Sequence, residues 1–406
     1  MQPGAPNLSV NRHDESPGGS RPRSAGRYGP RAALSRTGRA AAGRIAIAGY
    51  HEGLARLRAG DRGGAIGAWR RSLSLDPGLG EAWTQLGLAL RAAGDLPGAR
   101  RAFRRAALLR PHRPIVWIDL AATLCDLGEF DAALASADKA RRLDPRSFEA
   151  WSTLGDAQRG SGRAASAVQC YRRALALRAD SSSVWFRLAE TLVDTGCLDA
   201  ASRAYRRAAE IEPRRFRLWF RLAHVEASRG RWETAVEGYR RATELNPDCH
   251  EAWYNLGTAY AELGRLRLAV EALGAAIDRC PRDPDVWNNL GNVMVELGRT
   301  HEGIRCYRNA LDLAPGYDPA WNNLGVALEE LGETREAAEA FTRALDAKPR
   351  QTTYVVNRAA ALARMGQRQE ALDQLSRSFP AEPVVRLLVG CLPEFGRLGV
   401  VPAEEE

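Results

Sequence analysis

The side chains that most often bind metals or act as nucleophiles are scattered along this chain. Its six histidines and seven cysteines form no CxxC pair, no HExxH motif and no nucleophile elbow, and no GxxxxGK[ST] phosphate loop is present. They are His13, His51, His112, His224, His250 and His301, and Cys125, Cys170, Cys197, Cys249, Cys280, Cys306 and Cys391. We therefore expect no catalytic residue, no metal site, no cofactor and no enzyme activity.

Asparagine amides, in contrast, recur at a regular interval in the C-terminal half. Four are separated by 34 residues each, and two more directly precede members of that series. The series is Asn255, Asn289, Asn323 and Asn357, and the neighbours are Asn288 and Asn322. Each amide offers two donors and one acceptor, which suits the backbone of an extended peptide whatever its sequence. The alternative is that these asparagines only belong to the repeat's own consensus.

A second set of candidate binding residues combines aromatic rings with guanidinium groups. The set comprises Phe186, Phe220 and Tyr254, together with Arg187, Arg221, Arg217 and His224. Aromatic and arginine side chains dominate binding hot spots, and the planar guanidinium group suits carboxylates. We expect this set to bind an acidic segment that carries one bulky apolar side chain. The alternative is that the rings pack between repeats and that the arginines are solvated.

The 34-residue interval extends along most of the chain. Ten glycines lie in one frame without insertion or deletion, and eight of the ten tryptophans lie in another. The glycines are Gly60, Gly94, Gly128, Gly162, Gly196, Gly230, Gly264, Gly298, Gly332 and Gly366. Prolines such as Pro247 and Pro281 recur near the end of each unit. A fixed period of this length indicates a tandem array of one supersecondary unit.

Each unit reads as a pair of helices. In residues 250–283 the first apolar face has helical spacing and comprises Trp253, Leu256, Gly257 and Tyr260. Gly264 should end this helix in the left-handed conformation, and Pro281 should stop the second one. One such pair cannot bury its apolar face alone, so neighbouring pairs must stack.

The pattern W-x-x-L-G-x-x-Y followed by Ala269, Ala276 and Pro281 resembles the tetratricopeptide repeat. The resemblance implies an all-α, right-handed α-solenoid superhelix of ten helical hairpins over residues 46–385, with repeats starting at 46 and every 34 residues thereafter. It also implies that the first helices line a concave groove. We number the positions of each 34-residue repeat from its first residue and call them slots; the side chains at slots 2, 5, 6 and 9 then project into the groove. Slot 6 holds the asparagine series, which is similar to the asparagine ladder of O-linked N-acetylglucosamine transferases. We expect no catalytic domain of that family in this chain.

The two ends lie outside the repeats. Residues 1–45 are rich in Gly, Pro, Ser and Arg and hold eight arginines but only two acids, so we expect a disordered basic tail. Residues 386–406 should form a capping helix and a frayed C-terminus. A self-association patch in that segment, which would make a homo-oligomer, is the alternative to the cap.

The net charge of +9 and the composition limit the partners. The unpaired thiols favour a reducing, cytoplasmic location, and no apolar run is long enough to span a membrane. We predict a protein-binding scaffold or adaptor with an acidic protein or peptide partner and no small-molecule substrate. One alternative is an accessory subunit that delivers substrates to a separate enzyme such as a glycosyltransferase. The other is a nucleic-acid-associated factor that uses the basic tail and the arginine pairs of the second helices, although acids beside those pairs favour a simple solvated face.

Overall fold

The computed structural model describes residues 36–379, which form twenty α-helices and no strand. The odd-numbered helices are the first helices of the repeats: α1 (Arg36–Arg58), α3 (Gly80–Ala92), α5 (Pro114–Asp126), α7 (Phe148–Gly160), α9 (Ser182–Asp194), α11 (Phe216–Ser228), α13 (His250–Glu262), α15 (Pro284–Glu296), α17 (Asp318–Glu330) and α19 (Thr352–Arg364). The even-numbered helices are the second helices: α2 (Arg62–Leu75), α4 (Leu96–Leu109), α6 (Phe130–Leu143), α8 (Ala164–Leu177), α10 (Leu198–Ile211), α12 (Trp232–Leu245), α14 (Leu266–Arg279), α16 (Thr300–Leu313), α18 (Thr334–Ala347) and α20 (Arg368–Ser378). The prediction of an all-α solenoid is confirmed.

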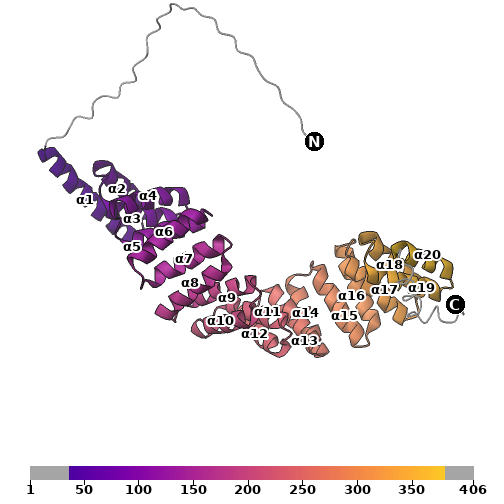
Figure 1. Cartoon of the computed structure of the whole chain (residues 1–406). Coiled ribbons are helices and arrows are strands. Elements are labelled where there is room, and N and C mark those ends of the chain that lie inside the picture. Colours follow the sequence, from indigo (N-terminus) through magenta and orange to yellow (C-terminus); the bar gives the residue numbers. More distant parts are fainter. Residues whose placement is uncertain (1–35, 380–406) are drawn as a thin grey trace, which may run out of the picture. The chain divides into compact units, whose positions relative to one another are not determined.

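Two compact units divide the chain, residues 1–82 and residues 83–406. In the first unit α1 packs against α2, and the indole N–H of Trp69 donates to the Tyr50 carbonyl at 3.2 Å. In the second unit each first helix from α5 to α19 packs against its own second helix, and each second helix from α4 to α18 packs against the next first helix, as Figure 1 shows.

The ten glycines spaced by 34 residues adopt the left-handed conformation that the sequence predicts at the ends of the first helices. All ten glycines have a positive φ, between 67° and 82°. After α13, the Gly264 N–H donates to the Ala261 carbonyl at 2.8 Å and the Arg265 N–H donates to the Tyr260 carbonyl at 2.9 Å. These two bonds satisfy carbonyls that the helix end would leave unpaired, and a residue with a Cβ would be strained at that φ.

The tryptophan and proline frames are joined by a repeated hydrogen bond. The indole N–H donates to the carbonyl of the residue six positions earlier, at 2.8–3.0 Å, in seven successive repeats. In six of them the acceptor is the framed proline, as for Trp253 and Pro247; in the seventh it is Ala179. The proline therefore does more than stop the second helix, because its carbonyl also fixes the tryptophan that begins the next repeat.

An aromatic ring from each of seven second helices fills the centre of its repeat. These rings are at most 2% exposed: Trp69, Phe103, Tyr171, Tyr205, Tyr239, Tyr307 and Phe341. Slot 8 of the first helix, often glycine, provides the space. A Cβ on Gly155 would lie 2.6 Å from the Tyr171 ring, and one on Gly291 would lie 2.5 Å from the Tyr307 ring. The small residue thus leaves room for the ring against the first helix. In Tyr171 and Tyr307 the hydroxyl then reaches Asp156 and Asn292, respectively, on that helix.

Helix α1 begins ten residues before the predicted start of the array. Residues 36–45, which the sequence analysis assigned to the tail, are helical up to and beyond position 45. Alanines at 40–42 have the highest intrinsic helix propensity, so the helix extends although no apolar period marks it. The rest of the predicted tail, and the predicted cap over residues 386–406, lie outside the described residues.

Candidate functional site

The first helices of the second unit form one continuous face, which we call the first-helix face. Neighbouring first helices touch directly, for example α5 with α7, α13 with α15, and α17 with α19. At three junctions, between α7 and α9, between α9 and α11 and between α15 and α17, a slot-6 side chain meets the slot-9 side chain of the preceding repeat, 31 residues earlier. The buried tyrosine of the second helix, which is Tyr171, Tyr205 or Tyr307 at these three junctions, donates to the same slot-9 group.

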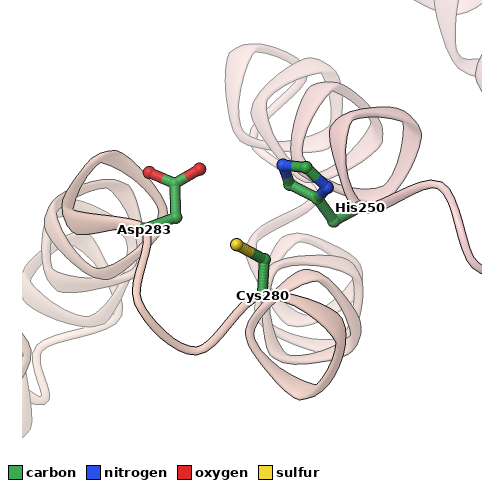
Figure 2. Close-up of side chains that lie close together, drawn as sticks. All are labelled: His250, Cys280 and Asp283. Atoms are coloured by element: carbon green, nitrogen blue, oxygen red, sulfur yellow. The ribbon is translucent and has the colours of Figure 1, made fainter.

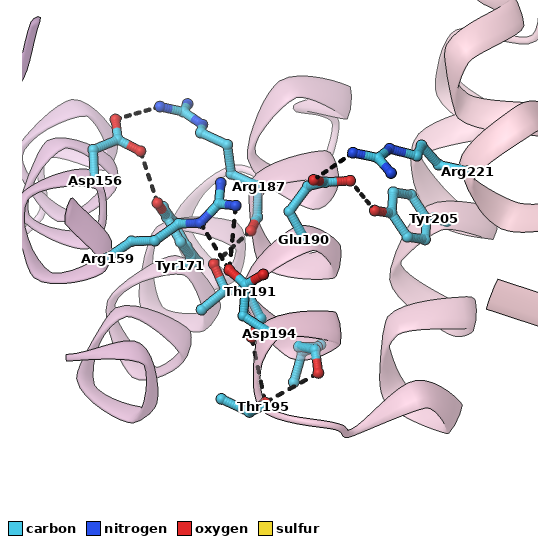
Figure 3. Close-up of polar contacts among 11 residues, drawn as sticks. Asp156, Arg159, Tyr171, Arg187, Glu190, Thr191, Asp194, Thr195, Tyr205 and Arg221 are labelled. Atoms are coloured by element: carbon cyan, nitrogen blue, oxygen red, sulfur yellow. Dashed lines mark hydrogen bonds and ion pairs between the residues drawn. The ribbon is translucent and has the colours of Figure 1, made fainter. Parts of the chain in front are cut away.

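Around α7, α9 and α11 these junctions are ionic (Figure 3). Arg187 forms an ion pair with Asp156 and also donates to the Ser152 hydroxyl at 3.1 Å. The hydroxyl of Tyr171 donates to the other Asp156 oxygen at 2.8 Å. Burial raises the pKa of Asp156, and Arg187 together with the Tyr171 hydrogen bond opposes that rise. The arginine and the tyrosine therefore favour the charged form of a poorly hydrated carboxylate.

One repeat further the same arrangement recurs. Arg221 pairs with Glu190 at 3.2 Å, and the Tyr205 hydroxyl donates to the other Glu190 oxygen (Figure 3). Burial and the neighbouring carboxylate raise the pKa of the Tyr205 hydroxyl, so it remains a donor. We call these two junctions the charged ladder; its members are Asp156, Tyr171, Arg187, Glu190, Tyr205 and Arg221.

In the C-terminal repeats the junctions are made by neutral amides, which we call the amide chain. Its members are Asn288, Asn289, Asn292, Asn322, Asn323 and Asn357. Between helices, Asn357 Nδ2 donates to Asn322 Oδ1 at 2.9 Å, and Asn323 Nδ2 donates to Asn288 Oδ1 and to Asn292 Oδ1 at 3.0 Å each. Within a helix, longer contacts of 3.4 Å join Asn322 to Asn323 and Asn288 to Asn289.

The amide chain ends at Tyr254, whose hydroxyl accepts from Asn289 Nδ2 at 2.9 Å. Asn255, the first member of the predicted series, takes no part, because its Nδ2 donates to the Glu251 carbonyl of its own helix at 2.7 Å. The structure thus brings three of the four predicted slot-6 asparagines and both predicted neighbours into one network. Asn292 at slot 9 was not singled out from the sequence, although its spacing of 31 residues from Asn323 carries the signal.

Several residues of the predicted aromatic and arginine set line a pocket of about 410 Å³. We call it the anchor pocket; its lining is Phe216, Arg217, Phe220, Arg221, Asn246, Cys249 and Glu251. The other members lie elsewhere. Phe186 packs edge-on against Tyr205, with ring centroids 5.8 Å apart, and His224 is exposed on α11 outside the pocket lining. Phe220 also packs edge-on, against Tyr239 at 5.8 Å, which fixes its ring.

A second hollow of about 590 Å³ lies on the first-helix face beside the charged ladder, and sequence reasoning missed it. Its charged lining consists of three arginines and three aspartates: Arg91, Asp126, Asp156, Arg159, Arg187 and Asp194. Arg91 pairs with Asp126 at 2.8 Å and Arg159 with Asp194 at 3.3 Å, each across 35 residues. That spacing, from slot 12 of one repeat to slot 13 of the next, was the available signal.

The arginine pairs of the second helices are exposed. Several of them face acids of their own helix, such as Arg207 with Glu210 and Arg241 with Glu244, both at 2.8 Å. Exposed pairs of this kind contribute little to stability, and they fit the solvated face that the sequence analysis favoured.

Stacked helical hairpins of constant length place the chain in the class of helical-repeat solenoids. Family models extend that assignment: the model of the Cilia and flagella-associated protein 70 C-terminal domain matches residues 176–383, and three models of the tetratricopeptide repeat match residues 50–114, 90–157 and 148–191. The chain belongs to the tetratricopeptide-repeat family. Repeat solenoids of this kind present extended surfaces that bind other proteins.

Two solved structures are similar to parts of the chain. "Crystal structure of MamA" is 26% identical, with a TM-score of 0.39, over 40% of this chain and 95% of that one. "Crystal structure of MamA protein" is 25% identical, with a TM-score of 0.40, over 43% of this chain and 94% of that one. A comparison with curated protein sequences finds no match. Within residues 36–379, no helix combines the length and apolar character needed to cross a membrane.

Proposed function

We propose that this chain is a scaffold that binds an extended protein segment along its first-helix face. The observation that carries the proposal is the anchor pocket, in which Phe216 and Phe220 lie beside Arg217 and Arg221 on that face. Aromatic rings that are fixed by packing lose little entropy when a ligand binds, and arginine beside them supplies a carboxylate partner.

The two arginines of the anchor pocket have different roles in this proposal. Arg221 is half-buried and already pairs with Glu190, so a ligand carboxylate would have to share it. Arg217 is exposed at the rim, and we assign it the main contact with an acidic side chain. A bulky apolar side chain of the ligand fits between the two phenylalanine rings. Glu251 in the same lining disfavours a second acid on that side.

The amide chain supports backbone contacts beyond the pocket. An asparagine amide carries two N–H donors, and the hydrogen bonds of Asn289 and Asn357 described above use one each. The second donor of each can pair with a carbonyl of an extended segment without breaking the chain. Asn323 already uses both donors. We therefore assign backbone binding to Asn289 and Asn357 more than to Asn255 or Asn323.

Selection of random 16-residue peptides displayed on phage tests this proposal with the full-length protein. We expect enriched peptides to carry Asp or Glu close to a bulky apolar residue. Arg217→Glu combined with Phe220→Ala should abolish that enrichment, because it removes both the cation and the ring. Arg267→Glu, a charge change on the second helix α14, is the matched control and should leave the enrichment intact.

Two results would contradict the proposal. One is that no peptide motif is enriched on the wild-type chain. The other is that the Arg217 and Phe220 double variant, with unchanged helical circular dichroism, enriches the same peptides as the wild type.

A further inference from the structure

Three potential metal ligands meet at the edge of one repeat, beside the anchor pocket, whose lining residues Cys249 and Glu251 flank the first of them. They are His250, Cys280 and Asp283, and their ligand atoms all lie within 4.8 Å of one another. Figure 2 shows the imidazole, the thiol and the carboxylate around a common space. His250 begins α13, Cys280 caps the end of α14 and Asp283 caps the start of α15.

The repeat geometry brings these positions together, as other repeats demonstrate. His250 is at slot 1 and Cys280 at slot 31 of the repeat 250–283. In the repeat 318–351 the same two slots hold Asp318 and Lys348, which form an ion pair at 2.9 Å. In the repeat 148–181 they hold Phe148 and Arg178, whose guanidinium lies 4.1 Å from the ring centroid. Slots 1 and 31 therefore face each other in the fold, and in this repeat they carry an imidazole and a thiol.

The donor set selects a type of ion. Nitrogen, sulfur and oxygen ligands from His, Cys and Asp suit Zn²⁺, which accepts all three in tetrahedral geometry. Magnesium and calcium ions require oxygen ligands and are disfavoured. We propose that His250, Cys280 and Asp283 bind one zinc ion, with a water molecule as the fourth ligand. All three residues are half-buried, which leaves one side of the site open to that water.

Neighbouring groups orient two of the ligands. His250 Nδ1 lies 3.3 Å from a Glu251 carboxylate oxygen, which leaves Nε2 for the metal. A carboxylate behind a ligating histidine fixes the ring and strengthens the ligand. Asp283 Oδ1 accepts the Asp285 backbone N–H at 3.0 Å, so the second carboxylate oxygen is available to the ion. In this way the start of α15 holds the carboxylate in place.

A bound ion would tie the start of α13, the end of α14 and the start of α15 together. It binds the folded arrangement and not the unfolded chain, so zinc stabilises this repeat by mass action. The stability of the repeat 250–283 therefore depends on the zinc concentration.

Cobalt substitution in the full-length, chelator-treated and reduced protein tests the site. We expect one Co²⁺ per chain with a thiolate-to-cobalt band in the near ultraviolet and the visible bands of tetrahedral cobalt, and displacement of both by Zn²⁺. Cys280→Ser should remove the thiolate band, and Cys280→Ser and His250→Ala should each weaken zinc binding by about 100-fold or more in competition with a chelator. Asp283→Asn should weaken zinc binding and keep the thiolate band.

Matched controls locate the thiol and the imidazole. Cys197→Ser changes an exposed thiol and His224→Ala an exposed imidazole, and both should bind metal like the wild type. Cys249→Ser should also retain the band, although Cys249 is adjacent to His250. The proposal is overturned if the wild type binds no cobalt at one per chain, if the complex lacks the thiolate band, or if Cys249→Ser loses the band and Cys280→Ser keeps it. Helical circular dichroism and the melting temperature without metal confirm that each variant is folded.

Discussion

The charged ladder and the junction of the amide chain between α15 and α17 use the same slots of different repeats. In both, a slot-6 side chain meets a slot-9 side chain of the preceding repeat, and a framed tyrosine donates to that same slot-9 group. Asp156 and Arg187 fill these positions with opposite charges, whereas Asn292 and Asn323 fill them with neutral amides. The comparison indicates that the repeat accepts either an ionic or a neutral polar bond at this junction. The protein can therefore change its binding surface without changing its stacking.

The largest difference between the two regions is expected when the slot-9 acceptor is removed from each. Asp156→Ala should lower the free energy of unfolding by about 2–4 kcal/mol, because Arg187 keeps a half-buried charge and Tyr171 loses its acceptor. Asn292→Ala should lower it by only about 1–2 kcal/mol, because neutral groups remain. Urea titrations fitted with a nearest-neighbour repeat model measure both losses.

A double variant sharpens this result. Asp156→Asn with Arg187→Asn places amides in the charged ladder and should recover most of the stability that Asp156→Ala loses. Equal losses for Asp156→Ala and Asn292→Ala would show that charge makes no difference at the junction.

The second test concerns what the two regions share. Gly155→Ala and Gly291→Ala should each destabilise the protein by about 1–2 kcal/mol, because a Cβ would press on the Tyr171 or Tyr307 ring at 2.6 or 2.5 Å. The gain in helix propensity offsets part of that cost. Urea titration measures the effect. Gly274→Ala on α14 is the control: a Cβ there meets no atom within 4 Å, so this variant should be slightly more stable than the wild type. A large difference between Gly155→Ala and Gly291→Ala would contradict a common architecture.

The smallest expected effect comes from a slot-6 acid that has no polar slot-9 residue. Asp119 follows Leu88 by 31 residues, and burial raises the pKa of Asp119 to about 6, with Arg91 opposing the rise. The unfolded chain ionises this group near the ordinary aspartate pKa of 3.8, so stability falls as the pH rises from about 4 to 6 and the penalty is complete above 6. A pKa of about 6 instead of 3.8 corresponds to about 3 kcal/mol. Because Asp119 is only partly buried and solvent screens part of that energy, we expect Asp119→Asn to be more stable than the wild type by about 1 kcal/mol at pH 7.5 and about equal at pH 4.

The melting temperatures of the two proteins across that pH range test the sign. An Asp119→Asn advantage that is the same at pH 4 and pH 7.5 would exclude ionisation of Asp119 as its cause.

The sequence predicts the fold well, because each residue type that recurs every 34 residues acts on its own local structure. Gly264 ends a helix and Pro281 stops one whatever surrounds them, and the helical period of Trp253 and Leu256 places the buried side. The start of α1 was harder to predict, since alanine propensity there has no apolar period to mark it. Residues and spacing therefore define the hairpins but not the first turns of the array.

The site was predicted less completely, because its side chains bind one another. The sequence indicates which slots vary, but not that Asn255 turns back to Glu251 or that Arg187 is held by Asp156. Those choices depend on pairs 31 or 35 residues apart. The sequence did not single out the proposed metal ligands His250 and Cys280 for the same reason, since motif searches test short intervals and these two residues are 30 positions apart.

The donors of the amide chain all point the same way. Between helices, from Asn357 to Asn322, from Asn323 to Asn288 and from Asn289 to Tyr254, each Nδ2 donates toward the N-terminal end of the array. An amide inside the row cannot reverse without opposing both of its neighbours, so the row has a fixed polarity. A polypeptide also has a polarity, from its amino to its carboxyl end. The two orientations of a bound segment are therefore inequivalent on this surface, and the protein can distinguish a sequence from its reverse even where it contacts only backbone.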